Sequence, residues 1–224
     1  MTKLKICGLM TERDVALVSG LGVDFLGFVS GYPQKTPWEL EEAQAKKLIQ
    51  AAPRGAACFL VTGGAPQAVI ARARALQPSV LQLQYQETIE ETDEIARALL
   101  PYGIRTVKAL PVRPDGTSEL EGYPNLKDAM EALAQTGVWA VLLDTRSPSA
   151  PDKSRTLHLA AYQRAMEAAR LPVMVAGGIT ADNAGLIAKK LRPFALDVLS
   201  GSEQRPGEKD ADRIKALLHA VREK

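Results

Sequence analysis

The feature that most constrains the fold of this chain is a repeat of eight short apolar segments, each followed by a stretch with helical character. The segments are rich in Val, Leu, Ile and Phe, as parallel strands covered by helices tend to be. They comprise residues Leu4–Gly8, Phe25–Ser30, Ala57–Thr62, Val80–Gln84, Thr106–Pro111, Ala140–Thr145, Val173–Ala176 and Leu196–Ser200. Eight such units in 224 residues predict closure into a single (β/α)8 barrel.

The alternative to a barrel is an open, doubly wound sheet. Such sheets usually have fewer strands, and no G-x-G-x-x-G motif follows an early strand here, so a dinucleotide-binding fold lacks its main marker. Neither a linker nor a change in composition divides the chain. Residues 1–224 are therefore expected to form one domain.

Residues that favour helix ends stand between the apolar segments. Thr36, followed by Pro37 and Glu39, predicts a helix start with a capping box, and Thr88 predicts a second one. Further N-caps are expected at Thr11, Asn125, Thr180 and Asp210. Glycines that precede strands are expected to end helices in the left-handed conformation, at Gly22, Gly103 and Gly137.

Charge and cysteine content exclude several classes of function. The net charge is +2, and no run of Lys or Arg forms the basic stripe of a nucleic-acid-binding protein. Cys7 and Cys58 form no C-x-x-C pair, which argues against a disulfide scaffold or a zinc site and favours a reducing cytoplasm. The apolar stretch at the N-terminus is too short for a signal peptide, and no segment is long enough to span a bilayer. We expect a cytoplasmic protein without a nucleic-acid or membrane partner.

In (β/α)8 barrels, active sites lie at the C-terminal ends of the strands and in the loops that follow. This rule selects a small set of candidate residues from the predicted strands. They are Cys7, Ser30, Gln84, Pro111, Asp144, Gly177, Gly178, Ser200 and Gly201.

Cys7 ends the first predicted strand. Strand alternation places Lys5 and Cys7 on the face opposite Leu4 and Ile6, so the thiol and the ammonium should point into the barrel. An ammonium close to a thiol favours the thiolate, and Asp197 on the closing strand is placed to pair with Lys5. Cys7 is then either a catalytic base or nucleophile, or a small buried hydrophobe.

Asp144 ends the sixth predicted strand after four apolar residues. It serves either as a general acid or as a cap for the following loop. Gly177-Gly178 and Ser200-Gly201 follow the seventh and eighth strands, where barrels often bind phosphate. The glycines alternatively serve only to make tight turns.

Several motifs resemble those of the phosphoribosylanthranilate isomerases of tryptophan biosynthesis, and the resemblance runs the length of the chain. The most specific pieces are LKICGLMTERD at the start and LDVLSGSEQRPGEKD near the end. Less specific pieces are FLGFV, LLDT and VAGGIT. The resemblance implies an Amadori rearrangement of a small phosphorylated sugar amine, without a metal or organic cofactor. It also implies that Cys7 is the general base, that Asp144 is the general acid, and that the two glycine-containing loops hold the phosphate.

The sequence departs from the family pattern in the parts expected to hold the substrate. The usual Gln-Leu-His-Gly at the end of strand four reads Gln82-Leu83-Gln84-Tyr85, and the Gly-Gly-Thr-Gly loop after strand six is absent. The arginine expected to hold the anthranilate carboxylate aligns with Thr36, next to Lys35. A lysine there lacks the bidentate fork of an arginine. Arg146, Lys153 and Arg155 are further candidates to replace this arginine.

These observations leave three hypotheses for function. The first is a divergent but active isomerase, in which residues such as Lys35 and Arg146 replace lost contacts. The second is a relative that retains the phosphate site but acts on a different ligand, and the third is a binding or regulatory barrel without catalysis. The sequence does not discriminate between a monomer and a homodimer. The polar segment after strand five, residues 111–125, is either a lid or a surface loop.

Overall fold

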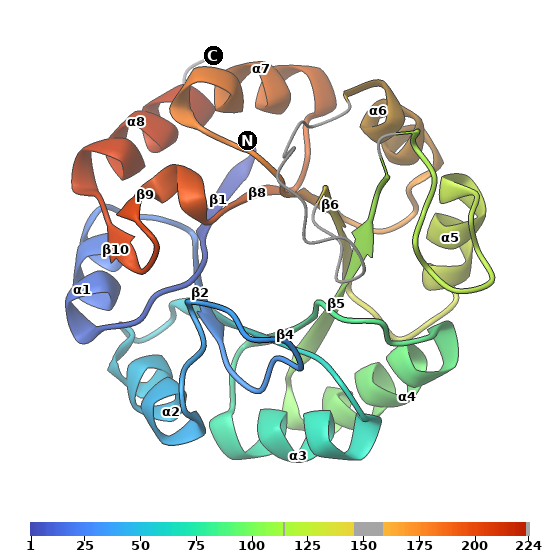
Figure 1. Cartoon of the computed structure of the whole chain (residues 1–224), viewed down its shortest axis with the longest axis horizontal. Helices are drawn as coiled ribbons and strands as arrows, with labels where there is room; N and C mark the ends of the chain where they lie inside the picture. Colours follow the sequence, from blue (N-terminus) through green and yellow to red (C-terminus); the bar gives the residue numbers. More distant parts are fainter. Residues whose placement is uncertain (114, 146–158, 223–224) are drawn as a thin grey trace.

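The computed structural model describes residues 1–113, 115–145 and 159–222, and in them it confirms the predicted barrel. Parallel strands β1 to β8 close into a ring in sequence order, and the helices surround this ring (Figure 1). The strands are β1 (Lys3–Ile6), β2 (Phe25–Val29), β3 (Ala57–Thr62), β4 (Val80–Leu83), β5 (Arg105–Pro111), β6 (Ala140–Asp144), β7 (Val173–Val175) and β8 (Ala195–Val198). The α-helices are α1 (Glu12–Gly20), α2 (Glu42–Ala51), α3 (Pro66–Leu76), α4 (Ile89–Leu99), α5 (Leu126–Leu133), α6 (Leu159–Ala168), α7 (Ala181–Leu191) and α8 (Ala211–Arg222).

Short elements interrupt the regular alternation at two places. A 3-10 helix, η1 (Leu100–Tyr102), follows α4. After β8 the chain forms the 3-10 helix η2 (Ser200–Ser202) and a two-stranded hairpin of β9 (Glu203–Arg205) and β10 (Glu208–Lys209) before α8 begins. This hairpin therefore follows directly from the C-terminal end of a barrel strand, where active-site loops are found.

Most of the predicted helix caps are confirmed. Thr11 and Thr88 each form a full capping box with the residue three positions later, which satisfies N–H groups that the first helical turn leaves unpaired. Thr180 begins α7 with Asn183 reaching back to its amide, and the side chains of Asn125 and Asp210 accept hydrogen bonds from the first turns of α5 and α8. Gly22 and Gly103 have positive φ, as expected, whereas Gly137 does not.

The predicted cap at Thr36 is wrong. Helix α2 begins at Glu42, after an N-cap at Glu41. The Glu39 carboxylate, which was expected to reach back to the cap, instead accepts hydrogen bonds from the amides of Gly31 and Tyr32. These bonds hold residues 31–40 as a loop after β2, which leaves Thr36 available to line the site described below.

The barrel interior has two parts: an apolar lower half, toward the N-terminal ends of the strands, and a polar upper half, toward their C-terminal ends. Strand residues alternate, so Leu4 and Ile6 pack outward against the helices. The lower half is filled by Phe25, Phe59, Val80, Val107, Ala109, Ala140, Leu142, Met174 and Ala195, and Ala176 of the same cluster reaches the cavity described below. Above this layer lie the buried polar side chains of Lys5, Gln82 and Asp197. Among the described residues, no helix is long and apolar enough to cross a membrane.

Candidate active site

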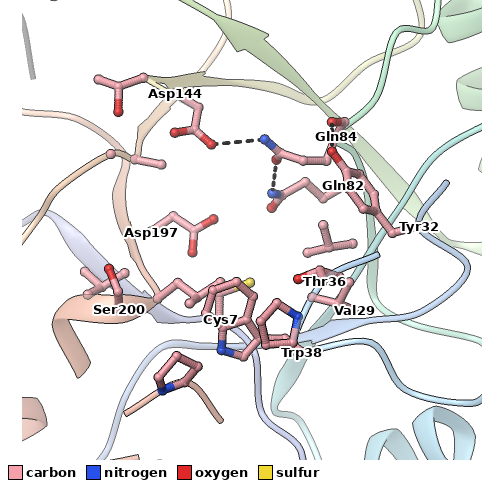
Figure 2. A pocket seen from close by; sticks show the side chains of 18 of the residues that line it. Cys7, Val29, Tyr32, Thr36, Trp38, Gln82, Gln84, Asp144, Asp197 and Ser200 are labelled. Atoms are coloured by element: carbon pink, nitrogen blue, oxygen red, sulfur yellow. Dashed lines mark hydrogen bonds between the residues drawn. The ribbon is translucent and has the colours of Figure 1, made fainter. Parts of the chain in front are cut away.

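The C-terminal ends of the strands surround a cavity of about 460 Å³. Figure 2 shows Asp144 and Cys7 on facing sides of it, with Asp197 between them. The cavity is lined by the following predicted site residues: Cys7, Lys35, Gln84, Asp144, Gly177, Gly178, Asp197 and Ser200. Ser30, Pro111 and Gly201 do not line it; the Ser30 hydroxyl donates to the carbonyl of Leu40 and serves the β2–α2 loop. Arg146, Lys153 and Arg155 lie outside the described residues.

Lys5 is the centre of the polar upper half. Its ammonium is fully buried and donates to Asp197 Oδ2 at 2.8 Å and to Gln82 Oε1 at 2.8 Å, while Cys7 Sγ lies 3.5 Å away. The predicted inward direction of Lys5 and its pairing with Asp197 are therefore confirmed. Burial by itself lowers the pKa of Lys5, but the charge of Asp197 and the proximity of Cys7 outweigh it, so the pKa is raised and the ammonium stays charged.

Lys5 lowers the pKa of the Cys7 thiol, as expected, but it does not lower it enough to offset burial. Burial raises the pKa of Cys7, the charge of Lys5 opposes this, the charge of Asp197 adds to it and Lys209 lowers it. The outcome is a pKa above the ordinary thiol value. The free-energy cost of removing a thiolate from water exceeds the stabilisation that the Lys5 ammonium gives it, because the negative charge of Asp197 offsets part of the effect of Lys5. Cys58, by contrast, lies between barrel and helices in the core, and burial raises its pKa to about 11.

Gly27 in β2 creates the space that Cys7 occupies, and the sequence reading missed it. A Cβ on Gly27 would lie 2.9 Å from both Cα and Sγ of Cys7 and 3.0 Å from Cε of Lys5. Glycine inside a strand often marks such a close approach, which was the available signal in FLGFV.

We expect Gly27→Ala to lower turnover about tenfold through displacement of Cys7, since shifts of a fraction of an ångström at a reacting group are costly. Steady-state kinetics would measure it. Gly20→Ala is the control, because a Cβ there meets nothing within 4 Å. A Gly27→Ala enzyme that is as active as the Gly20→Ala enzyme would contradict this role.

Asp144 ends β6 and points into the cavity. Its Oδ2 accepts a hydrogen bond from Gln84 Nε2 at 3.0 Å, and the residue is 7% exposed. The loop that it was alternatively expected to cap lies outside the described residues. None of the described residues of segment 112–125 lines the cavity; Gly116 in that segment approaches Ala161 and Arg164 of α6.

The loops after β7 and β8 approach each other closely. Gly177 and Gly178 have φ values of 101° and 60°, a region that side chains disfavour. A Cβ on Gly201 would lie 2.0 Å from the carbonyl oxygen of Ile179, so only glycine permits this contact. Gly177, Gly178 and Ser200 line the cavity at the N-terminus of α7, where a helix favours an anion.

A buried ion pair ties the β9–β10 hairpin to the candidate base. Lys209 Nζ contacts Glu203 Oε1 at 2.7 Å and also donates to the backbone carbonyl of Cys7. The same carboxylate oxygen accepts from Trp38 Nε1 at 2.9 Å, and the Trp38 ring packs on Gly8. The sequence reading missed Trp38, Glu203 and Lys209, because the contacts of Trp38 with Glu203 and of Lys209 with Cys7 join residues 165 and 202 positions apart in the chain.

The wall beside Cys7 is largely apolar and aromatic. It contains Val29, Tyr32 and Trp38 (Figure 2), together with Val61. Lys35 and Thr36 of the β2–α2 loop also line the cavity. Within the described residues, no three His, Cys, Asp or Glu side chains are grouped closely enough to hold a metal ion. The cavity thus combines a thiol, a carboxylate, an anion-favouring pair of loops and an apolar wall.

Comparison with known proteins identifies the family. The family model for N-(5'-phosphoribosyl)anthranilate (PRA) isomerase matches residues 4–220. The chain belongs to this family. A PRA isomerase from Bordetella petrii is 34% identical over 99% of this chain and 96% of its own length, and one from Haloferax volcanii is 32% identical over 99% and 94%.

Solved structures agree with this family assignment. The PRA isomerase of Thermotoga maritima has a TM-score of 0.80 at 27% identity, over 99% of this chain and 98% of that one. A PRA isomerase in complex with reduced 1-(o-carboxyphenylamino)-1-deoxyribulose 5-phosphate has a TM-score of 0.77 at 26% identity, with the same coverage. The predicted family and fold class are both confirmed, and these identities mark the chain as a divergent member of this isomerase family.

Proposed function

We propose that this chain catalyses the Amadori rearrangement of N-(5-phosphoribosyl)anthranilate to the 1-deoxyribulose 5-phosphate aminoketose in tryptophan biosynthesis, with Cys7 as general base and Asp144 as general acid. The observation that carries the proposal is that both groups face one cavity, between the loops after β7 and β8 and an apolar wall. The family assignment over nearly the whole chain supports the reaction.

The chemistry needs one acid and one base. In the proposed mechanism, protonated Asp144 gives its proton to the furanose ring oxygen, and the ring opens to a Schiff base. Cys7 then removes the proton from C2, and the resulting enolamine tautomerises to the aminoketose. The substrate phosphate binds at the loops of Gly177, Gly178, Ser200 and Gly201, which fixes the sugar between the two groups. Asp197 Oδ1 is buried and has no hydrogen-bond partner among the described residues.

We propose that Lys35 takes the place of the missing arginine and binds the anthranilate carboxylate from the cavity edge. Lys35→Met should then raise KM with little change in kcat, because the carboxylate stays away from the reacting carbons. Lys35→Arg should preserve or lower KM, since a guanidinium grips a carboxylate with two bonds. Steady-state kinetics of both variants would test this, and an unchanged KM in Lys35→Met would exclude Lys35 from binding.

The second hypothesis, a paralogue with another phosphorylated ligand, is less favoured, because many curated relatives that match along the full length carry the PRA isomerase name. The direct experiment is to give the purified protein phosphoribosylanthranilate and follow the loss of anthranilate fluorescence, together with rescue of a tryptophan auxotroph. We expect turnover and growth. Failure of both, with inorganic phosphate still bound by the protein, would favour the paralogue hypothesis.

A further inference from the structure

A chain of side-chain hydrogen bonds, here called the relay, connects Lys5, the neighbour of the candidate base, with the candidate acid Asp144. Lys5 Nζ donates to Gln82 Oε1 at 2.8 Å. Gln82 Nε2 in turn donates to Gln84 Oε1 at 2.7 Å, and Gln84 Nε2 donates to Asp144 Oδ2 at 3.0 Å (Figure 2). Lys5 also lies against Cys7 Sγ. All the side chains of this relay are buried.

The direction of the relay is fixed at its lysine end. An ammonium group has donors and no acceptor, so Gln82 must turn its carbonyl oxygen toward Lys5. Its NH2 group then faces Gln84, which must present its own carbonyl oxygen and direct its NH2 toward Asp144. Each amide therefore has one permitted orientation, and Asp144 Oδ2 is always the acceptor of the final bond.

We propose that Gln84 is a positioning residue for Asp144. Its hydrogen bond orients the Asp144 carboxyl group and confines the carboxyl proton to Oδ1, and Lys5 fixes the orientation of Gln84 through Gln82. A proton on Oδ2 would face the N–H of Gln84 and break the relay at its last bond. The acid form must therefore carry its proton on Oδ1. This inference rests on the proposed function only in that it assigns Asp144 as the acid.

The amide has a property that the histidine of the family's Gln-Leu-His-Gly pattern does not share. An imidazole gains or loses a proton near pH 6.5 and, when neutral, presents an acceptor as well as a donor. A glutamine amide does not titrate. The hydrogen bond from Gln84 to Asp144 is consequently maintained over the whole pH range in which the acid must change its protonation state.

The test is Gln84→Met, which retains the length of the side chain and removes both its donor and its acceptor. In the full-length protein with 13C-labelled aspartate, carboxyl NMR would follow the titration of Asp144, assigned by its loss in Asp144→Asn. Loss of a bond that favours the carboxylate should raise the midpoint by about one pH unit. The pH below which kcat declines should rise with it, while kcat itself falls about tenfold and KM stays unchanged.

Two further variants complete the design. Gln82→Met breaks the relay one bond earlier and should raise the midpoint by a smaller amount. Gln67→Met is the matched control, because Gln67 Nε2 also donates to a carboxylate, that of Glu94 at 2.9 Å, but on the exposed surface. It should alter neither the midpoint nor kcat.

The outcomes separate this inference from the proposed function. An unmoved Asp144 midpoint in folded Gln84→Met would overturn the inference. A raised midpoint in a protein whose parent shows no isomerase activity would support the relay and reject the proposed function. If Gln84→Met does not fold, Gln84→His provides a second test. It should add a new titration step to the Asp144 signal between pH 6 and 7, roughly the range of a histidine, and the absence of that step would also overturn the inference.

Discussion

Cys7→Ala is expected to lower kcat by about 10⁴-fold, the upper end of what a positioned general base supplies. Alanine offers no group to accept the C2 proton, and the neighbouring Lys5 is a charged donor with no acceptor. The side chain is small and its backbone is held by Lys209, so the fold and the phosphate loops should remain as they are. Stopped-flow or steady-state loss of anthranilate fluorescence would measure the decrease.

Binding separates a loss of chemistry from a loss of structure. The affinity of Cys7→Ala for reduced 1-(o-carboxyphenylamino)-1-deoxyribulose 5-phosphate, measured by calorimetry, should equal that of the parent. Cys58→Ala is the matched control, since that thiol is buried outside the barrel interior and should not affect kcat. Undiminished turnover in Cys7→Ala would remove the thiol from the mechanism.

The pH dependence provides an independent test of the same assignment. Because burial raises the pKa of Cys7 above its usual value, the thiol is deprotonated only at higher pH than an exposed cysteine. Catalysis needs protonated Asp144 together with deprotonated Cys7, so kcat/KM of the parent should be level between the two midpoints and decline with rising pH only above the ordinary thiol value near 8.5. A decline centred well below that value would assign the base to another group.

The fold was predictable because its signals are local. Each strand is a short apolar run, and Thr11, Thr88, Asn125 and Thr180 satisfy helix ends within three or four residues of themselves. The same local pattern failed at Thr36. There the Glu39 carboxylate accepts hydrogen bonds from the amides of Gly31 and Tyr32. The folded loop brings these amides close to Glu39, and a capping pattern in the sequence contains no information about that contact.

Those features of the candidate site that depend on position along a strand were predictable. Those that depend on side-chain rotamers and on long-range contacts were not. Strand ends and alternation were enough to place Cys7, Asp144 and Lys5. The balance that sets the thiol pKa depends on how completely the group is removed from water, which alternation does not measure. The bond between Gln84 and Asp144 joins residues 60 positions apart, and it depends on amide orientations that Lys5 imposes from a third strand.

Asp144→Asn should lower kcat by about 10²-fold or more, within the range for general acids. Asparagine has nearly the same shape and retains an oxygen that can accept the hydrogen bond from Gln84, but its amide does not give up a proton to the ring oxygen. The substitution therefore removes the acid with little change in packing, and KM should remain close to that of the parent. Asp182→Asn, at an exposed position in the first turn of α7, is the matched control and should leave kcat unchanged.

The reaction step that each substitution blocks distinguishes the acid from the base. Ring opening precedes removal of the C2 proton, so Asp144→Asn should hold the substrate as the closed furanose. Cys7→Ala should still permit opening and should not exchange the C2 hydrogen with solvent. Substrate labelled with 13C at C1 and deuterium at C2 would show these states by NMR under single-turnover conditions. An Asp144→Asn enzyme that opens the ring at the parental rate would show that another group protonates the sugar.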